Sequence, residues 1–338
     1  MKTKQTRIPM PVRYGINLVL TVVLWAVLFA MIKGGVITNY WSGILVTIGI
    51  NIILTVSLNV ATGYLGQLPL GHAGFMAVGA YAGALFWKAV PGLPTPVAIV
   101  CGILIAGLAA SLFGVIIGVP ALRLKGDYLA IITLGFGEII RIAIINLPDI
   151  TGGTPGLLNV PKYTNFTVTF LCLVVCCFVV HNLMHSRHGR AILAIRDNEI
   201  AADCCGINLT AYKVFAFALS AFFAGVAGAV YAGLQGSLFP KSFDFMASIN
   251  VLVMVVLGGM GSMTGSIIAA TVLTALPLIM QSFNSFRMVV YSLLLIMVMI
   301  FKPSGLLGHK DFSMTKTIEY FMNFKAIRAR KKEVAPDA

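Results

Sequence analysis

Residues 186–213 read SRHGRAILAIRDNEIAADCCGINLTAYK, and an apolar run long enough to cross a membrane lies on each side of them. The charged residues of this segment include Arg187, Arg190, Arg196, Asp197, Glu199 and Asp203. Charged side chains are costly at the centre of a bilayer, so a segment with this many charges is expected at the membrane surface. The sequence therefore predicts a short structured unit, which we call the polar module (residues 186–213), held there by the helices on either side.

The composition of the whole chain is typical of a membrane protein. Of its 338 residues, 59% are hydrophobic and 10% are charged, and the mean hydropathy is +0.94. Soluble domains carry about 25% charged residues. Several apolar runs approach the ~20 residues that a helix needs to cross a bilayer, and they are continuous, whereas strands of a membrane barrel alternate. The predicted fold class is all-α, a polytopic bundle of transmembrane helices.

The apolar runs predict about eight full spans and one short or re-entrant helical hairpin. The predicted spans are residues 16–32, 41–60, 61–88 (with an interrupted start), 97–119, 127–147, 166–184, 211–234 and 288–301. The hairpin covers 251–280, because GGMGSMTGS at 258–266 divides this run into halves that are each short for a crossing. The chain then consists of an N-terminal segment (1–15), a transmembrane domain (16–301) and a basic tail (302–338).

The positions of the basic residues predict the topology. If the N-terminus and the polar module are both cytoplasmic, the cytoplasmic segments hold 18 of the 24 Lys and Arg residues, and the outer loops hold four. Cytoplasmic loops are enriched in Lys and Arg in this way. The count requires the 251–280 hairpin to return to the outer side, and it places both termini in the cytoplasm. The net charge of +13 therefore follows topology and does not indicate nucleic-acid binding.

The polar module has the sequence features of two short helices. Ala191, Ile192, Ala194 and Ile195 recur at helical spacing between Arg190 and Arg196. Asp197 or Asn198 is suited to cap a second helix, with Glu199 in its first turn, and Gly206 is suited to end that helix in a left-handed conformation. Two short helices with one apolar side and a charged rim are suited to a groove on a partner. A solvated loop folded against its own spans is the alternative.

Glycine-rich segments mark two predicted helix breaks inside the membrane. ATGYLGQLPLGHAG at 61–74 and GGMGSMTGS at 258–266 place Gly and Pro at membrane depth, which is tolerated where protein covers the backbone or a cavity adjoins it. Transporters build substrate paths from such breaks, although close helix packing also favours glycine. The candidate path residues here are Gly63, Gly66, Gln67, Gly71, His72, Gly258 and Gly259.

Glu138 and Arg141 are the charged residues inside the predicted fifth span. They are three residues apart, so they lie on one face of a helix, where a mutual pair lowers the cost of burying either charge. One interpretation is that they line the translocation path. The other is a structural ion pair that holds this span in the bundle.

No residue pattern indicates an enzyme, a metal site or a cofactor. The six cysteines show no paired CxxC spacing, and the histidines lack carboxylate partners at metal-site spacing. No G-x-x-x-x-G-K-[ST] loop is present to bind a nucleotide phosphate. The basic tail carries aromatic and aliphatic residues among its charges, so it is suited to an anionic lipid surface.

Several segments resemble one transporter family. The run EIAADCCG at 199–206 resembles the EAA loop of ABC importer permeases, although Ile200 stands where the strict pattern has Glu, and Glu199 lies one residue upstream. The wider strings GRAILAIRDNEIAADCCGIN, GYLGQLPLGHAGFMAVGAYAGAL, GDYLAIITLGFGEIIRIAI and VFAFALSAFFAGVAGAVYAG resemble branched-chain amino acid permeases of the LivM type. They cover most of residues 61–265 in the order of that family.

The resemblance implies a multi-pass permease subunit of an ABC importer in the bacterial inner membrane. Its partners would be a second permease of the LivH type, two ABC ATPases and an extracytoplasmic solute-binding protein, besides membrane lipid. Urea, short amides and other amino acids are alternative substrates, and a self-contained secondary transporter or channel is an alternative of another class. The residues expected to couple the module to an ATPase are Arg190, Arg196, Glu199, Ala201, Ala202 and Gly206.

Overall fold

A computed structural model describes residues 10–35, 37–124 and 126–279, with short pieces at 292–293, 296–297, 300–302, 305–306 and 308. The chain divides into two compact units, Met1–Thr38 with Asp311–Ala338, and Asn39–Lys310. Helix α1 (Met10–Lys33) is the described element of the first unit, and it starts six residues before the predicted span at 16–32. Most of the predicted span at 288–301 and most of the basic tail lie outside the described residues.

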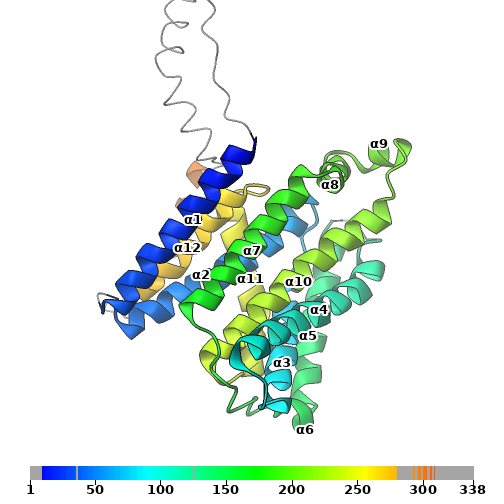
Figure 1. Cartoon of the computed structure of the whole chain (residues 1–338). Coiled ribbons are helices and arrows are strands. Elements are labelled where there is room, and N and C mark those ends of the chain that lie inside the picture. Colours follow the sequence, from blue (N-terminus) through cyan, green and yellow to red (C-terminus); the bar gives the residue numbers. More distant parts are fainter. Residues whose placement is uncertain are drawn as a thin grey trace, which may run out of the picture. The chain divides into compact units, whose positions relative to one another are not determined.

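The second unit holds the polar module and the predicted helix breaks (Figure 1). Its elements are α2 (Asn39–Asn59), the π-helix η1 (Val60–Tyr64), α3 (His72–Ala89), α4 (Thr95–Ala121), α5 (Asp127–Ile145), α6 (Pro148–Thr151), α7 (Phe166–His185), α8 (Arg187–Asp197), α9 (Glu199–Cys204), α10 (Leu209–Gln235), the 3₁₀ helix η2 (Pro240–Phe243), α11 (Phe245–Gly258) and α12 (Met263–Ile279).

The all-α membrane bundle is confirmed for the described residues. Five of their helices are long and apolar enough to cross a membrane: α2 with η1, α4, α5, α7 and α10. Apolar segments of α1, α11 and α12 are shorter. The predicted third span corresponds to α3, which has 18 residues but is not among the five, since His72, Lys88 and its glycines make it less apolar.

Helices α2, α3 and α10 form the centre of the second unit. In α2 with η1, 78% of the apolar window is buried and in α10 67% is, whereas α4, α5 and α7 have 22–28% buried. Glycines allow α3 and α10 to approach closely, because a Cβ at Gly79 would clash with the backbone of Gly225, and a Cβ at Gly228 would clash with Met76. Gly79 and Gly83 of α3 therefore belong to a helix-packing surface of small residues.

The first predicted break lies between η1 and α3. Helix α2 continues four residues past the predicted end of the span at Val60, as the π-helix η1. Gly63 therefore lies within the helix and not beyond it. Gly66 then adopts φ +77°, a left-handed conformation that favours glycine. The Thr133 hydroxyl of α5 accepts the Leu70 N–H at 3.0 Å, which holds the residues before α3 inside the bundle.

The second predicted break is the tip of the α11–α12 hairpin. Gly259 and Gly261 have φ values of +107° and +84° between the two helices. Helix α12 runs antiparallel to α2, because Ser262 is bonded to Asn59 at one end and Thr274 to Asn51 further along. The Leu306 N–H donates to Leu257 O at 2.8 Å, which brings residue 306 to the same tip.

Candidate functional site

The polar module contains the two predicted short helices, α8 and α9, at one end of the second unit (Figure 1). The Ser186 hydroxyl accepts the Gly189 N–H at the start of α8. Asn198 caps α9 by accepting the N–H groups of Ile200 and Ala201 at 3.0 and 3.1 Å. Gly206 follows α9 with φ +79°, as the left-handed conformation predicted for it requires.

A partly buried ion pair holds α9 against α10. Lys213 Nζ lies 2.6 Å from Glu199 Oε1, and the exposed side-chain fractions are 7% for Lys213 and 26% for Glu199. Gln67 Nε2 also donates to Glu199 Oε1, at 3.4 Å. The side chain of Glu199, which is expected to be a coupling residue, is therefore turned toward the transmembrane helices. Gln67, a candidate path residue, contacts the module and does not line the cavity described below.

The surface that α9 presents to solvent is small and mostly apolar, with Asp203 as its exposed charged residue. Ile200 is 75% exposed, and it stands where the strict EAA pattern has Glu. Ala201 and Gly206 are exposed beside it, whereas Ala202 is buried at 3% and packs the helix onto the module. Arg190 is exposed on α8. Of the expected coupling residues, Arg190, Ala201 and Gly206 are thus available to a partner, together with Ile200.

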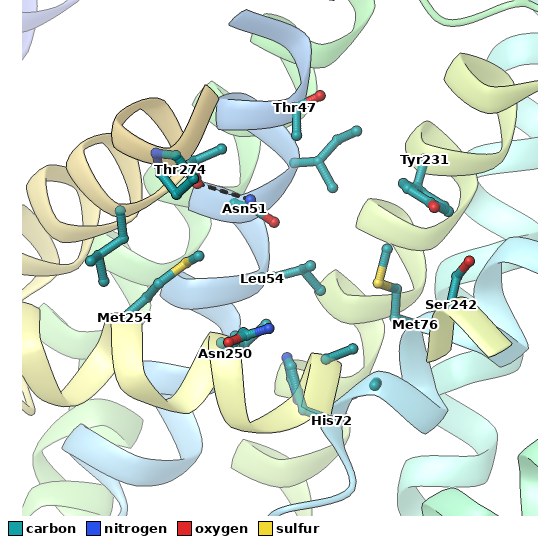
Figure 2. Close-up of a pocket in the computed structure, with 16 residues that line it drawn as sticks. Thr47, Asn51, Leu54, His72, Met76, Tyr231, Ser242, Asn250, Met254 and Thr274 are labelled. Carbon is teal, nitrogen blue, oxygen red and sulfur yellow. Dashed lines mark hydrogen bonds between the residues drawn. The ribbon is translucent and has the colours of Figure 1, made fainter. Parts of the chain in front are cut away.

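A cavity of about 440 Å³ lies within the second unit, among α2, α3, α10, η2, α11 and α12. Figure 2 shows its labelled side chains converging from these elements on a common space. The lining comprises Thr47, Ile50, Asn51, Leu54, His72, Ala73, Met76, Tyr231, Ser242, Ala247, Asn250, Val251, Met254, Leu273, Thr274 and Pro277. A cavity of this size falls in the usual range for small-molecule sites.

The cavity wall is mostly aliphatic, with uncharged polar groups at intervals. Asn51 Nδ2 donates to Thr274 Oγ1 at 2.9 Å (Figure 2). His72 is buried at 1%, and its Nε2 lies 2.9 Å from Ser57 Oγ. No Asp, Glu, Lys or Arg is among the described residues that line the cavity. Such a surface suits a small molecule with an aliphatic part and hydrogen-bonding groups.

The other predicted path residues are not among the described residues that line this cavity. Gly71 is buried beside Thr133 at the start of α3, and Gly258 ends α11. Glu138 and Arg141 form an ion pair of 2.8 Å on α5, with exposed side-chain fractions of 32% and 28%. The pair that the sequence indicates is present, but neither residue lines the cavity.

A contact that we call the junction joins the polar module, η1 and the hairpin tip. Arg196 Nη1 donates to Gly63 O at 3.1 Å. Asn59 Oδ1 accepts the Gly261 N–H at 2.9 Å, and Asn59 Nδ2 donates to Ser262 O at 3.1 Å. The junction consists of Asn59, Gly63, Arg196, Gly261 and Ser262, so it unites a predicted coupling residue with both predicted helix breaks.

Asn59 of the junction and Lys213 of the ion pair with Glu199 were not among the residues predicted from the sequence. Asn59 is buried at 1%, and Lys213 is buried at 6%. A signal for both was present, because an isolated amide or amine within or beside an apolar run is costly in a membrane and needs a partner. Asn51, Asn250 and Thr274 of the cavity carry the same signal in their apolar helices.

Sequence comparisons match the chain to permease components of branched-chain amino acid transport systems. The family model described as the permease component of branched-chain amino acid transport systems matches residues 40–301. The chain is similar to LivM, the high-affinity branched-chain amino acid transport system permease protein of Salmonella typhimurium, with 38% identity over 300 residues, which cover 76% of this chain and 68% of that protein. It is also similar to LivH of the same organism, with 26% identity over 275 residues, or 74% of this chain and 88% of LivH.

Among solved structures, PsaBC from Streptococcus pneumoniae in complex with Fab aligns over 82% of this chain and 97% of that chain, with a TM-score of 0.44 and 15% identity. The assignment rests on the sequence relationships, which extend over most of the membrane bundle described above. By the match over residues 40–301 and the identity with LivM, the chain belongs to the family of branched-chain amino acid transport system permease components.

Proposed function

We propose that this chain is the LivM-type permease subunit of an ABC importer, and that it carries leucine, isoleucine and valine into the cell. The family match over residues 40–301 is the observation that carries the proposal. The two-helix module supports it, because α9 offers an exposed apolar surface of Ile200 and Ala201 on a support fixed by the Lys213–Glu199 pair. The protein is a multi-pass protein of the inner membrane.

The proposed topology has about eight full spans and a short or re-entrant hairpin, with both termini (1–15 and 302–338) in the cytoplasm. Segments predicted to be cytoplasmic meet at the module end of the second unit, where Gly66, Gly126 and Arg196 line one hollow. Segments predicted to be external also meet, since Leu157 pairs with Leu238 and Lys88 Nζ donates to Leu158 O. This sorting of loops supports the predicted division of the loops between two sides of the membrane.

The cavity is the proposed substrate-binding site of this chain. Branched-chain amino acids have aliphatic side chains, which suit Leu54, Met76 and Met254, and charged main-chain groups, which need hydrogen-bonding partners. Asn51, Asn250 and the His72 ring supply neutral groups of that kind. The absence of charged side chains from the described lining disfavours a substrate with an ionised side chain, because nothing in the wall would neutralise it.

The proposed assembly pairs this chain with a LivH-type permease, two ABC ATPases and an extracytoplasmic solute-binding protein. The described residues contain no phosphate-binding loop of their own, so ATP hydrolysis is assigned to the separate subunits. The α9 surface is the proposed docking site for one ATPase.

The proposed function predicts ATP-dependent uptake of leucine, isoleucine and valine by the reconstituted complex. The measurement is radiolabelled uptake into proteoliposomes that hold both permeases and both ATPases, with the solute-binding protein outside. Uptake by this chain alone without ATP would establish a self-contained transporter instead. Uptake of urea but not of leucine would reassign the substrate while leaving the ABC mechanism intact.

Ile200→Lys tests the docking surface with a charge that the EAA pattern does not have at this position. Ile200 is 75% exposed, so the substitution does not disturb the core, but it places a charge at the centre of the proposed interface. We expect co-purification of the ATPase with the permease to fall at least about tenfold, the effect of losing an interface hot spot. Thr210→Lys is the control, since Thr210 is an exposed residue at the start of α10. Equal co-purification of the parent and the Ile200 variant would exclude α9 as the docking site.

A further inference from the structure

Arg196 belongs to the polar module, but its guanidinium bonds to the backbone of a transmembrane helix. Nη1 donates to Gly63 O at 3.1 Å, while Nε and Nη2 donate to Asp197 Oδ1 at 3.1 and 3.0 Å. Gly63 lies in the last turn of η1, where carbonyl groups lack helical partners, so the arginine occupies a position that would otherwise need water. A planar guanidinium is suited to hold these two acceptors at once.

The helical turn whose backbone Arg196 contacts also bonds to the hairpin tip, through the side chain of Asn59. Asn59, one turn before Gly63, accepts the Gly261 N–H and donates to Ser262 O. Gly66 makes room for the arginine, since a Cβ there would lie 2.9 Å from Arg196 Cγ. A Cβ at Gly261 would lie 3.3 Å from Arg196 Nη1, so the arginine and the tip are direct neighbours.

The junction lies between the cavity and the module. Leu54 lines the cavity, and Asn59 is five residues further along the same helix, about 7 Å toward the module. On α11, Met254 lines the cavity, and the helix ends at Gly258 beside the tip. Helix α12 leaves the tip and reaches the cavity at Leu273 and Thr274. Separation of the tip from η1 would therefore displace the two helices that form one wall of the cavity.

We propose that Arg196 is a positioning residue through which the polar module controls whether the cavity is closed at its module end. When the module is in the described position, the guanidinium holds η1 beside the hairpin tip, and Asn59 closes the gap through its two hydrogen bonds. Movement of the module on ATP hydrolysis would withdraw the guanidinium from Gly63 O and release the tip. The proposal rests on the proposed function, because it assumes that an ATPase moves the module.

The test uses Arg196→Gln and Arg196→Lys in the reconstituted complex and measures solute transported per ATP hydrolysed, normalised to assembled complex. We expect this ratio to fall about tenfold in Arg196→Gln, within the usual range of coupling between sites. The loss is expected to be smaller in Arg196→Lys, which retains the positive charge together with N–H donors. Arg187→Gln is the control, because it removes an exposed arginine from the same helix. A normal ratio in Arg196→Gln would overturn the proposal.

Two further measurements separate a gate from a general structural defect. Asn59→Ala disrupts the junction without altering the module, so it is expected to lower the ratio of solute transported to ATP hydrolysed. The ratio in the double variant Arg196→Gln/Asn59→Ala is expected to be no lower than in the poorer single variant. Hydrogen exchange of the backbone at 257–266 is expected to be faster in Arg196→Gln at an unchanged melting temperature. The proposal would be contradicted if the losses in transport per ATP of the two single variants multiplied in the double variant, or if hydrogen exchange at 257–266 were unchanged. Failure of the parent complex to import leucine would contradict the proposed function instead.

Discussion

Gly63→Ala is expected to destabilise the protein more than any other single methyl addition in α2 and η1. A Cβ at Gly63 would clash with Asn59 Oδ1 and with the backbone nitrogen of Gly261. Backbone atoms cannot rotate away as a flexible side chain does, so the hairpin tip must separate from η1 or the helix must shift. Overpacking of this kind costs about 3 kcal/mol. The measurement is the unfolding free energy of the purified permease in detergent, with ATP-dependent uptake as a second readout.

Gly43→Ala is the matched control for this experiment. It makes the same chemical change in the same long helix, but no atom lies within 4 Å of the added Cβ. Alanine also has a higher helix propensity than glycine, so this variant is expected to be neutral or more stable by up to about 1 kcal/mol. If Gly63→Ala unfolded with the same free energy as Gly43→Ala, the close contact of η1 with the hairpin tip would be wrong.

Glu199→Ala is expected to lower stability by about 3 kcal/mol, since it leaves the buried Lys213 ammonium without its carboxylate partner. Only 7% of the Lys213 side chain is exposed, against 26% of Glu199. Lys213→Met should therefore lower stability by less, because the Glu199 carboxylate that remains still contacts water and the Gln67 amide. The measurement is the thermal unfolding midpoint of the purified permease, together with retention of the bound ATPase.

The double variant Glu199→Ala/Lys213→Met shows whether the pair itself is responsible. Removing both charges avoids an unpaired buried charge, so its stability is expected to exceed that of Glu199→Ala alone. Lys88→Met serves as the control, since Lys88 is exposed and its ammonium bonds to Leu158 O. Additive losses in the double variant would show that the two side chains act independently.

Most of the local structure of the module could be predicted from the sequence. The Asn198 cap, the left-handed Gly206 and the two short helices depend on residues within a few positions of one another, so the sequence pattern contains them directly. The direction of the Glu199 side chain could not be predicted in this way. It depends on how α10 places Lys213 beside α9. The prediction that Glu199 is a coupling residue used only the neighbouring residues in the chain.

The translocation path stays a prediction, but the two helix breaks are present, at Gly66 and at Gly258 and Gly259. Of the candidate path residues, His72 lines the cavity. The cavity itself was not predicted, because its wall combines α2 and α3 with α10, η2, α11 and α12, which follow much later in the chain. The extension of α2 as a π-helix was also missed, since its closing turn is stabilised by the tip and by Arg196 and not by its own residue types.

The sequence by itself determined the all-α membrane class, the two helix breaks and the two-helix module, because hydropathy, capping residues and glycine positions act over short distances along the chain. Only the tertiary structure decided which distant groups meet. Arg196 reaches Gly63 across 133 positions, and Asn59 reaches Gly261 across 202. Inside a membrane, buried polar groups must find protein partners, and the packing of the helices decides which partners are within reach.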